Sequence, residues 1–169
     1  MKRYEYQHRF PIPPGRLIAL IDEDPYRDFI ASNLPNLAGY ERLEFRWEGK
    51  KRIKHVRMEF DSPVPGWIKR AMPGEGKGWM EERSILYPEE RRMECEMRSS
   101  LTQGRRTIYF RDGADSSETL RLTQGDFRCT TPLLAGALER FVASEMEKNR
   151  DTEFDLTMRY LREHPPGSD

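Results

Sequence analysis

Apolar and polar side chains alternate strictly along several short segments between residues 40 and 124. In the clearest of these segments, Met93, Cys95 and Met97 alternate with charged residues. Successive side chains of a β-strand point to opposite faces of a sheet, so this period of two predicts strands with one face on a core and one face in water. The chain is therefore expected to form an antiparallel sheet whose outer face is charged.

Seven strands are expected in all. In the first, residues 4–10, the side chains of Tyr4, Tyr6, His8 and Phe10 share one face, and the prolines that follow end the strand. A lone histidine on such a face is more often a hydrogen-bonded core residue than a catalyst. The other strands are expected at residues 40–48, 55–60, 79–87, 92–98, 107–111 and 119–124.

Two of these strands carry their apolar residues in an unusually simple pattern. Leu43, Phe45 and Trp47 alternate with charged residues in the segment 40–48, and Leu120 and Leu122 share one face of the segment 119–124. We expect both sets on the covered face of the sheet. A turn at residues 49–50 should join the segment 40–48 to the next strand as a hairpin.

Helical patterns surround the strands. Two short helices are expected between Pro13 and Leu34. Near the C-terminus, Pro132 stands at a favourable first helical position, and no helix breaker follows Gly136 until Pro165. This stretch predicts one helix of about thirty residues, or about 45 Å. Its apolar stripe would consist of Leu134, Leu138, Phe141, Val142, Leu156 and Tyr160.

The order of these elements predicts the fold class. One strand, two short helices, six strands and a long C-terminal helix indicate an α+β helix-grip fold, in which the helix crosses a seven-stranded curved antiparallel sheet. With no repeat or linker, we expect a single ligand-binding domain at residues 1–164 and a disordered tail at residues 165–169. A straight helix laid on a concave sheet leaves apolar space beside it. A fully packed core is the alternative.

Composition limits the partners and the chemistry. Twenty-nine basic residues balance 29 acidic ones, which argues against a nucleic-acid partner. The sequence has no apolar run of membrane-spanning or signal length, so a cytoplasmic protein is expected. Two cysteines and three scattered histidines show no metal-ligand spacing. We assign no catalytic residue, metal or cofactor.

Several candidate ligand-binding residues lie on the expected long helix. The polar residues Glu145, Asn149 and Thr152 fall near the centre of its apolar stripe, beside Phe141. They are expected to face the cavity with Tyr109 of the sheet and to contact the polar head of a ligand. Alternatively, the helix is partly exposed at this point, or Glu145 pairs with an arginine of a strand.

A second group of candidates lies in the segment from residue 63 to residue 78, which is rich in proline and glycine. Trp67, Ile68 and Met72 would form a mobile lid over the cavity, with the glycines as hinges. Lys69 and Arg70, together with Trp67, would then make transient contact with a membrane surface. The alternative is a short helix packed into the core.

The element order resembles that of the START-like, Bet v 1-like (SRPBCC) helix-grip superfamily. Residues 6–13 and 131–139 are similar to the bacterial DUF2505 family, and residues 64–70 with 82–85 are similar to the PRELI/MSF1 phospholipid-transfer family. The resemblance implies binding, and possible transfer, of a lipid or other apolar small molecule in a cavity between sheet and helix. It also leaves the need for a partner protein open.

Two other functions remain open at this level. Related cyclase or aromatase enzymes use the same cavity, and His8, Tyr109 and Glu145 would be the catalytic candidates here. With a packed core, the chain would instead be an interaction module. We expect ligand binding rather than catalysis.

Overall fold

A single antiparallel sheet runs through the computed structural model, which describes residues 1–61, 65–71, 78–130 and 135–165. Its strands have the order β1-β7-β6-β5-β4-β3-β2. The elements follow along the chain as β1 (Lys2–Phe10), α1 (Pro14–Leu20), α2 (Asp24–Asn33), β2 (Leu37–Glu48), β3 (Lys51–Phe60), α3 (Gly66–Ala71), β4 (Gly78–Tyr87), β5 (Arg92–Ser99), β6 (Thr102–Asp112), β7 (Thr119–Cys129), α4 (Ala135–Asn149) and α5 (Thr152–Glu163).

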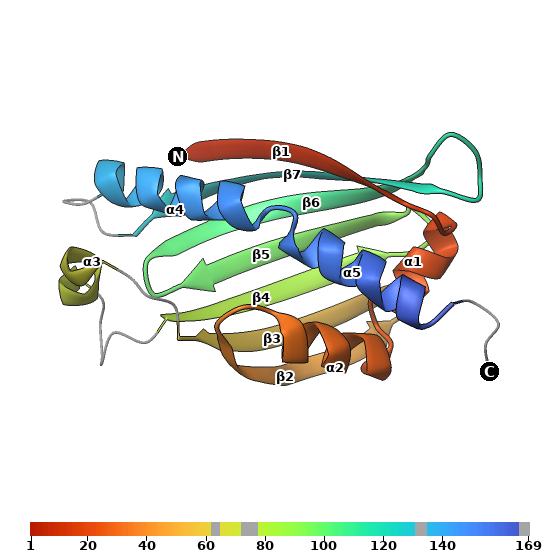
Figure 1. Cartoon of the computed structure of the whole chain (residues 1–169), viewed down its shortest axis with the longest axis horizontal. Coiled ribbons are helices and arrows are strands. Elements are labelled where there is room, and N and C mark those ends of the chain that lie inside the picture. Colours follow the sequence, from red (N-terminus) through yellow and green to blue (C-terminus); the bar gives the residue numbers. More distant parts are fainter. Residues whose placement is uncertain (62–64, 72–77, 131–134, 166–169) are drawn as a thin grey trace.

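The α+β helix-grip prediction is confirmed. All seven expected strands form, the two short helices precede the second strand, and the C-terminal helical segment lies across the sheet (Figure 1). The turn at residues 49–50 joins β2 to β3 as expected, and Gly49 adopts a φ of 58°, which favours glycine. The expected tail lies outside the described residues except for Pro165.

The main apolar core joins the sheet to α1, α2 and α5. Phe10 of β1 and Leu20 of α1 are almost fully buried there, and Phe154 of α5 packs against the same cluster. Tyr26 of α2 reaches Thr157 of α5 with a hydroxyl–hydroxyl hydrogen bond of 2.8 Å. This contact ties the two helices together above the sheet.

A smaller apolar cluster lies at the opposite end of the sheet, where Figure 1 shows α3 and α4. It consists of the buried side chains of Ile68, Leu101 and Leu138, packed against Cys129, Phe141 and Val142. The two clusters divide the helical layer into an α1–α2–α5 end and an α3–α4 end.

The single long C-terminal helix is the main correction to the predicted fold. The segment breaks at Arg150 and Asp151 into α4 and α5. Asp151 Oδ1 lies 2.8 Å from Nε2 of His8, which is buried on β1. This contact holds the chain against the sheet at the break, and α5 continues from there toward α2 (Figure 1). The predicted start of the helix, including Pro132 and Leu134, lies outside the described residues.

Two predicted apolar faces are also corrected. In β7 the buried side chains are Thr119, Arg121, Thr123 and Phe127, so Leu120 and Leu122 lie on the opposite, outer face. In β2, Phe45 and Trp47 stand opposite Lys54 and Arg52 of the inner face, and Leu43 lies at a register shift, but all three side chains are exposed at this edge of the sheet.

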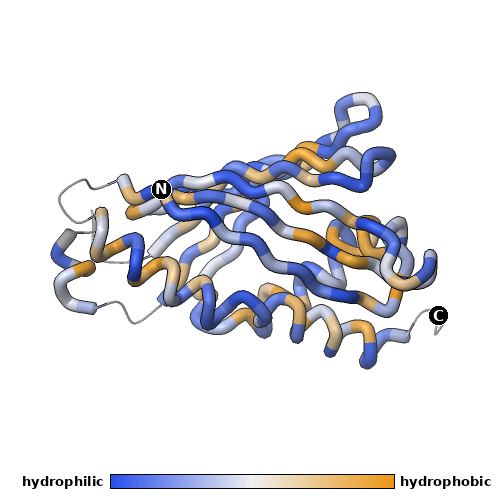
Figure 2. The backbone as a smooth tube through the Cα atoms, turned by 90° about the horizontal axis from the view of Figure 1, so that it is seen from above, coloured by the Kyte–Doolittle hydropathy of each residue, from blue (hydrophilic) through white to orange (hydrophobic). Residues whose placement is uncertain are grey.

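The outer face of the sheet is charged, as predicted. One row of side chains crosses six strands with largely alternating sign: His55, Arg83, Glu96, Arg105, Asp126 and Arg3. Hydrophilic and hydrophobic residues alternate along the backbone in Figure 2. None of the described helices has the length and apolar character needed to span a membrane.

Candidate ligand-binding site

A pocket of about 280 Å³ lies between the inner face of the sheet and helices α2 and α5. Most of its wall is apolar. The main contributors are Ile30 and Leu34 of α2, Val56 and Met58 of β3, Met80 of β4 and Phe110 of β6. Aliphatic, methionine and aromatic side chains of this kind are typical of sites for apolar molecules.

A polar row crosses the floor of this pocket. Lys54 of β3 stands opposite Ser84 of β4, which stands opposite Cys95 of β5, which in turn stands opposite Arg106 of β6. Lys54, Ser84 and Arg106 all line the pocket. The site therefore combines an apolar wall with ionisable groups on one floor.

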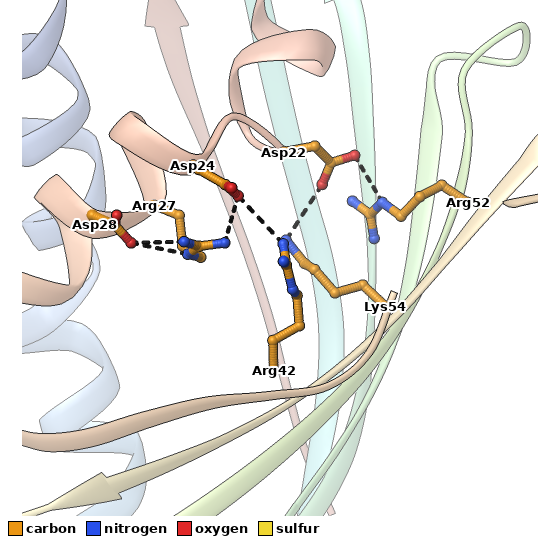
Figure 3. A network of polar contacts seen from close by, with 7 residues as sticks. All are labelled: Asp22, Asp24, Arg27, Asp28, Arg42, Arg52 and Lys54. Carbon is orange, nitrogen blue, oxygen red and sulfur yellow. Dashed lines mark hydrogen bonds and ion pairs between the residues drawn. The ribbon is translucent and has the colours of Figure 1, made fainter. Parts of the chain in front are cut away.

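Arg52 anchors one end of the floor. Its side chain is fully buried. Nε donates to Asp22 Oδ2 at 2.9 Å and one terminal nitrogen donates to the Ser84 hydroxyl at 2.8 Å. Asp22 lies between α1 and α2, so this pair holds the helices to the sheet (Figure 3).

Lys54 shares the same carboxylate. Its Nζ lies 3.4 Å from Asp22 Oδ1, on the other oxygen from the one that accepts from Arg52 (Figure 3). Burial lowers the pKa of Lys54, and the charge of Arg52 lowers it further, against the opposing effect of Asp22. The Lys54 ammonium is therefore incompletely compensated.

The other end of the floor holds two closed ion pairs. Arg106 donates to Glu82 at 2.5 Å, and Arg121 of β7 donates to Glu153 of α5 at 2.9 Å. Burial lowers the pKa of the Arg106 guanidinium, but Glu82 together with Cys95, Glu153 and Tyr6 outweighs burial and raises the pKa overall. Arg121 lowers the pKa of Glu153. Each pair therefore joins a guanidinium of the sheet to a carboxylate at hydrogen-bonding distance.

His8 lies next to this end of the floor but does not line the pocket. Its ring stacks on Phe154 at a centroid distance of 4.6 Å, and its Nδ1 lies 3.5 Å from Arg121. With Asp151 on Nε2, both ring nitrogens have partners. These contacts fit a hydrogen-bonded core histidine.

The predicted site residues lie elsewhere. Of the eight, Met72 is outside the described residues, and none of the other seven lines the pocket. Ile68 and Phe141 do meet, but in the smaller cluster beneath α4. Trp67 is exposed on α3, and Thr152 begins α5. A contact between these residues and a ligand stays a prediction.

The polar candidates are separated from one another as well. Glu145 accepts from Lys148 on the surface of α4, and Asn149 donates to the Glu145 carbonyl. Tyr109 is on the outer face of β6, with the Arg111 guanidinium over its ring. The structure therefore does not bring His8, Tyr109 and Glu145 together, because His8 is on the inner face.

A larger hollow of about 910 Å³ lies on the outer face, along Arg83, Glu96, Arg105 and Asp126. Charges of opposite sign face each other across the strands there, which stabilises a solvated surface. Among the described residues, no cluster of three His, Cys, Asp or Glu side chains could hold a metal ion. The inner pocket is thus the best candidate site.

No protein-family model matches the sequence, and neither does any curated protein. The resemblance to the DUF2505 and PRELI/MSF1 families therefore stays a prediction. Solved structures do match over nearly the whole chain. Identities below one sixth of the residues show a common fold and not a common activity.

Three of the matching structures illustrate the kinds of protein that share this fold. A protein from Thermus thermophilus is 14% identical over 97% of this chain and 99% of its own, with a TM-score of 0.71. A START superfamily protein from Mycobacterium smegmatis is 12% identical over 94% and 98%, with a TM-score of 0.62. The di-domain ARO/CYC protein BexL of the BE-7585A biosynthetic pathway is 15% identical over 98% of this chain and 48% of its own, with a TM-score of 0.61.

Proposed function

Given the helix-grip fold that this chain shares with START-like and Bet v 1-like proteins, we propose that it binds an apolar small molecule between the sheet and helices α2 and α5. The observation that carries the proposal is the pocket of about 280 Å³ with its largely apolar wall. A fully packed core would have favoured an interaction module instead. The pocket supports ligand binding.

The volume of the pocket limits the ligand. Small-molecule sites usually enclose about 300–1,000 Å³, so this one is at the small end. It suits an aromatic molecule or a single short chain better than a phospholipid with two acyl chains. Membrane contact through Trp67, Lys69 and Arg70 belongs to the same proposal, supported by the exposure of Trp67 and Arg70 on α3.

A pocket-filling variant tests the proposal. Met80→Trp should fill the apolar wall and abolish binding of 2-naphthalenemethanol, measured by isothermal titration calorimetry. Met97→Trp is the matched control, because Met97 is on neighbouring β5 and does not line the pocket. Native mass spectrometry of the purified protein would show any ligand carried from the cell. Failure to hold either a carried ligand or the probe would contradict the proposal.

A cyclase or aromatase activity is the second candidate. The observation that favours it is the convergence of Lys54, Glu82 and Arg106 on one pocket, since such enzymes orient their substrates with a few polar groups. A polyketide-like poly-β-ketone should then gain aromatic absorbance with the protein. Glu82→Gln should remove this turnover and leave binding in place. Binding without turnover would favour the carrier.

A further inference from the structure

Nearly all the positively charged side chains that line the pocket pair with a carboxylate of their own. Five cationic side chains contribute to the lining. Four of them have carboxylate partners of their own: Arg27 with Asp24 and Asp28, Arg52 with Asp22, Arg106 with Glu82 and Arg121 with Glu153. The fifth, Lys54, has to share Asp22 with Arg52. Among the described residues, the Asp22 end of the pocket therefore has two positive charges, Arg52 and Lys54, against one carboxylate.

The Lys54 ammonium lies where it can pair with a bound anion. Its side chain is 18% exposed, so water reaches it only partly. An ammonium group has three donors, and the contact with Asp22 is long at 3.4 Å. A buried cation without its own counter-ion is costly, so a bound anion here would be stabilised.

We propose that the ligand carries a single negative charge, as a carboxylate, that pairs with the Lys54 ammonium. Its apolar part would lie against Val56, Met58 and Met80. One positive charge is in excess at the Asp22 end, so a monoanion fits better than a doubly charged phosphate. This inference rests on the proposed ligand binding and specifies its chemical class.

Three naphthalene probes of similar shape distinguish the contribution of the head group to binding from that of the apolar part. We expect 2-naphthoate to bind roughly tenfold more tightly than 2-naphthalenemethanol, and 2-naphthylmethylamine to bind more weakly than either. Lys54→Met should remove the advantage of the carboxylate over the alcohol. Lys50→Met is the matched control, because Lys50 is at an exposed turn and pairs with Glu89.

The outcomes distinguish the two proposals. If the alcohol binds to the wild type and not to Met80→Trp, but the carboxylate has no advantage, the head-group inference is overturned and the proposed function stands. The same holds if Lys54→Met binds 2-naphthoate like the wild type. If no probe binds and no ligand is carried from the cell, the proposed function itself fails.

A different observation concerns the edge of the sheet. Three of the five most exposed large apolar side chains among the described residues are on β2: Leu43 at 44%, Phe45 at 38% and Trp47 at 54%. No described strand pairs with the outer side of β2. An uncovered edge strand with apolar side chains is a template for pairing with another strand.

The sequence of this edge is complementary to itself. Residues 42–48 read Arg-Leu-Glu-Phe-Arg-Trp-Glu. If a second copy runs antiparallel with the two Phe45 residues facing, then Glu44 of each copy faces Arg46 of the other, which would exchange a contact that Arg46 makes with Glu44 within its own strand. Leu43 lies at a register shift of the β2–β3 ladder and stays outside this pairing. Phe45 and Trp47 share a face, because they pair with Lys54 and Arg52 of β3. Pairs of this kind stabilise neighbouring strands.

We propose that two copies of this chain pair along β2 about a two-fold axis at Phe45. Such an interface is isologous, since the same surface serves on both subunits. One strand pair buries less than the roughly 1,200 Å² of standard stable interfaces, so the dimer should be weak. It should form over a protein concentration range of about 10 μM to about 1 mM.

Charge exchange provides a specific test. Glu44→Arg and Arg46→Glu should each be monomeric, since each places like charges opposite one another. An equimolar mixture of the two variants should recover a dimer that contains one copy of each, because all the facing charges then have opposite sign. Native mass spectrometry distinguishes this heterodimer, and sedimentation gives its affinity. Arg98→Glu, on the outer face of central β5, is the control.

Three outcomes would overturn the self-pairing: a wild type that stays monomeric at about 1 mM, single variants that still dimerise, or mixed variants that do not associate. Thermal melts of both variants, followed by circular dichroism, should match the wild type. A variant that fails to fold is replaced by Phe45→Lys, which should also abolish the dimer, and dimerisation of Phe45→Lys would count against the proposal.

Discussion

The Cys95 thiol is on the inner face of β5 and is almost completely buried. Burial, with a smaller contribution from Glu82, raises its pKa to about 12. Cys129, at the end of β7, is only partly buried. Because the thiolate is the reactive form, the two cysteines should differ strongly in reactivity.

We predict that iodoacetamide at pH 8 labels Cys129 and leaves Cys95 intact until the protein unfolds. A pKa of about 12 in place of the ordinary 9.0 makes the thiolate population of Cys95 roughly a thousandfold smaller. Peptide mass spectrometry before and after addition of urea would measure both sites. Cys129→Ser should take up no label in the native state. Equal labelling rates for the two cysteines would contradict the prediction.

The position of Lys54 on the inner face follows from the alternation of side chains along β3, although a charged residue is not expected there. Val56, Met58 and Phe60 predict the inner face of β3, and Lys54 and Arg52 continue the same parity. A charged residue in phase with apolar neighbours indicates an ion pair or a ligand contact. Glu145, Asn149 and Thr152 are predicted to face the cavity by the same argument, but helical spacing cannot show the break that separates Glu145 and Asn149 from Thr152.

At the scale of elements, the break between α4 and α5 depends on a tertiary contact. Neither Arg150 nor Asp151 is a helix breaker by composition. The structure places Asp151 on His8, and the hydrogen bond from His8 lowers the pKa of Asp151, with a further contribution from Arg150. Strand order and helix order were therefore predictable from local pattern, whereas the path of the last helix required its partner on β1.

Asp151→Ala should lower the free energy of unfolding more than Asp155→Ala does, because the buried ring of His8 loses its carboxylate acceptor. Asp155→Ala is the control, since Asp155 is exposed in the first turn of the same helix. Urea titration at pH 7 measures both. Equal effects of the two substitutions would show that the contact does not fix the break.

Over the whole molecule, buried neutral acids should set the alkaline limit of stability. Burial raises the pKa of Tyr4 to about 12, and it also raises the pKa of Tyr26. A group with a raised folded pKa contributes its full stability below its unfolded pKa, and that contribution is lost as the pH rises through the folded value. For Tyr4 this window extends from about pH 10 to about pH 12.

We predict that the urea midpoint falls steadily from about pH 10 to about pH 12, as the Tyr4 window requires. Tyr4→Phe should lose less stability over that interval than the wild type, because its ring carries no ionisable hydroxyl. Tyr87→Phe, at the end of β4, is the control. Identical pH profiles for Tyr4→Phe and the wild type would refute the assignment.

The pairing of β1 with β7 also has a consequence for biosynthesis. Phe10 lies opposite Thr119 and Lys2 lies opposite Phe127. The first strand can therefore pair only after a strand more than a hundred residues later has been synthesised. At the usual rate of translation this delay lasts about 5–25 s. During it, the N-terminal strand with Tyr4 and Tyr6 has no native strand partner on the nascent chain. Ribosome-associated chaperones are well suited to shield such a segment until synthesis reaches β7.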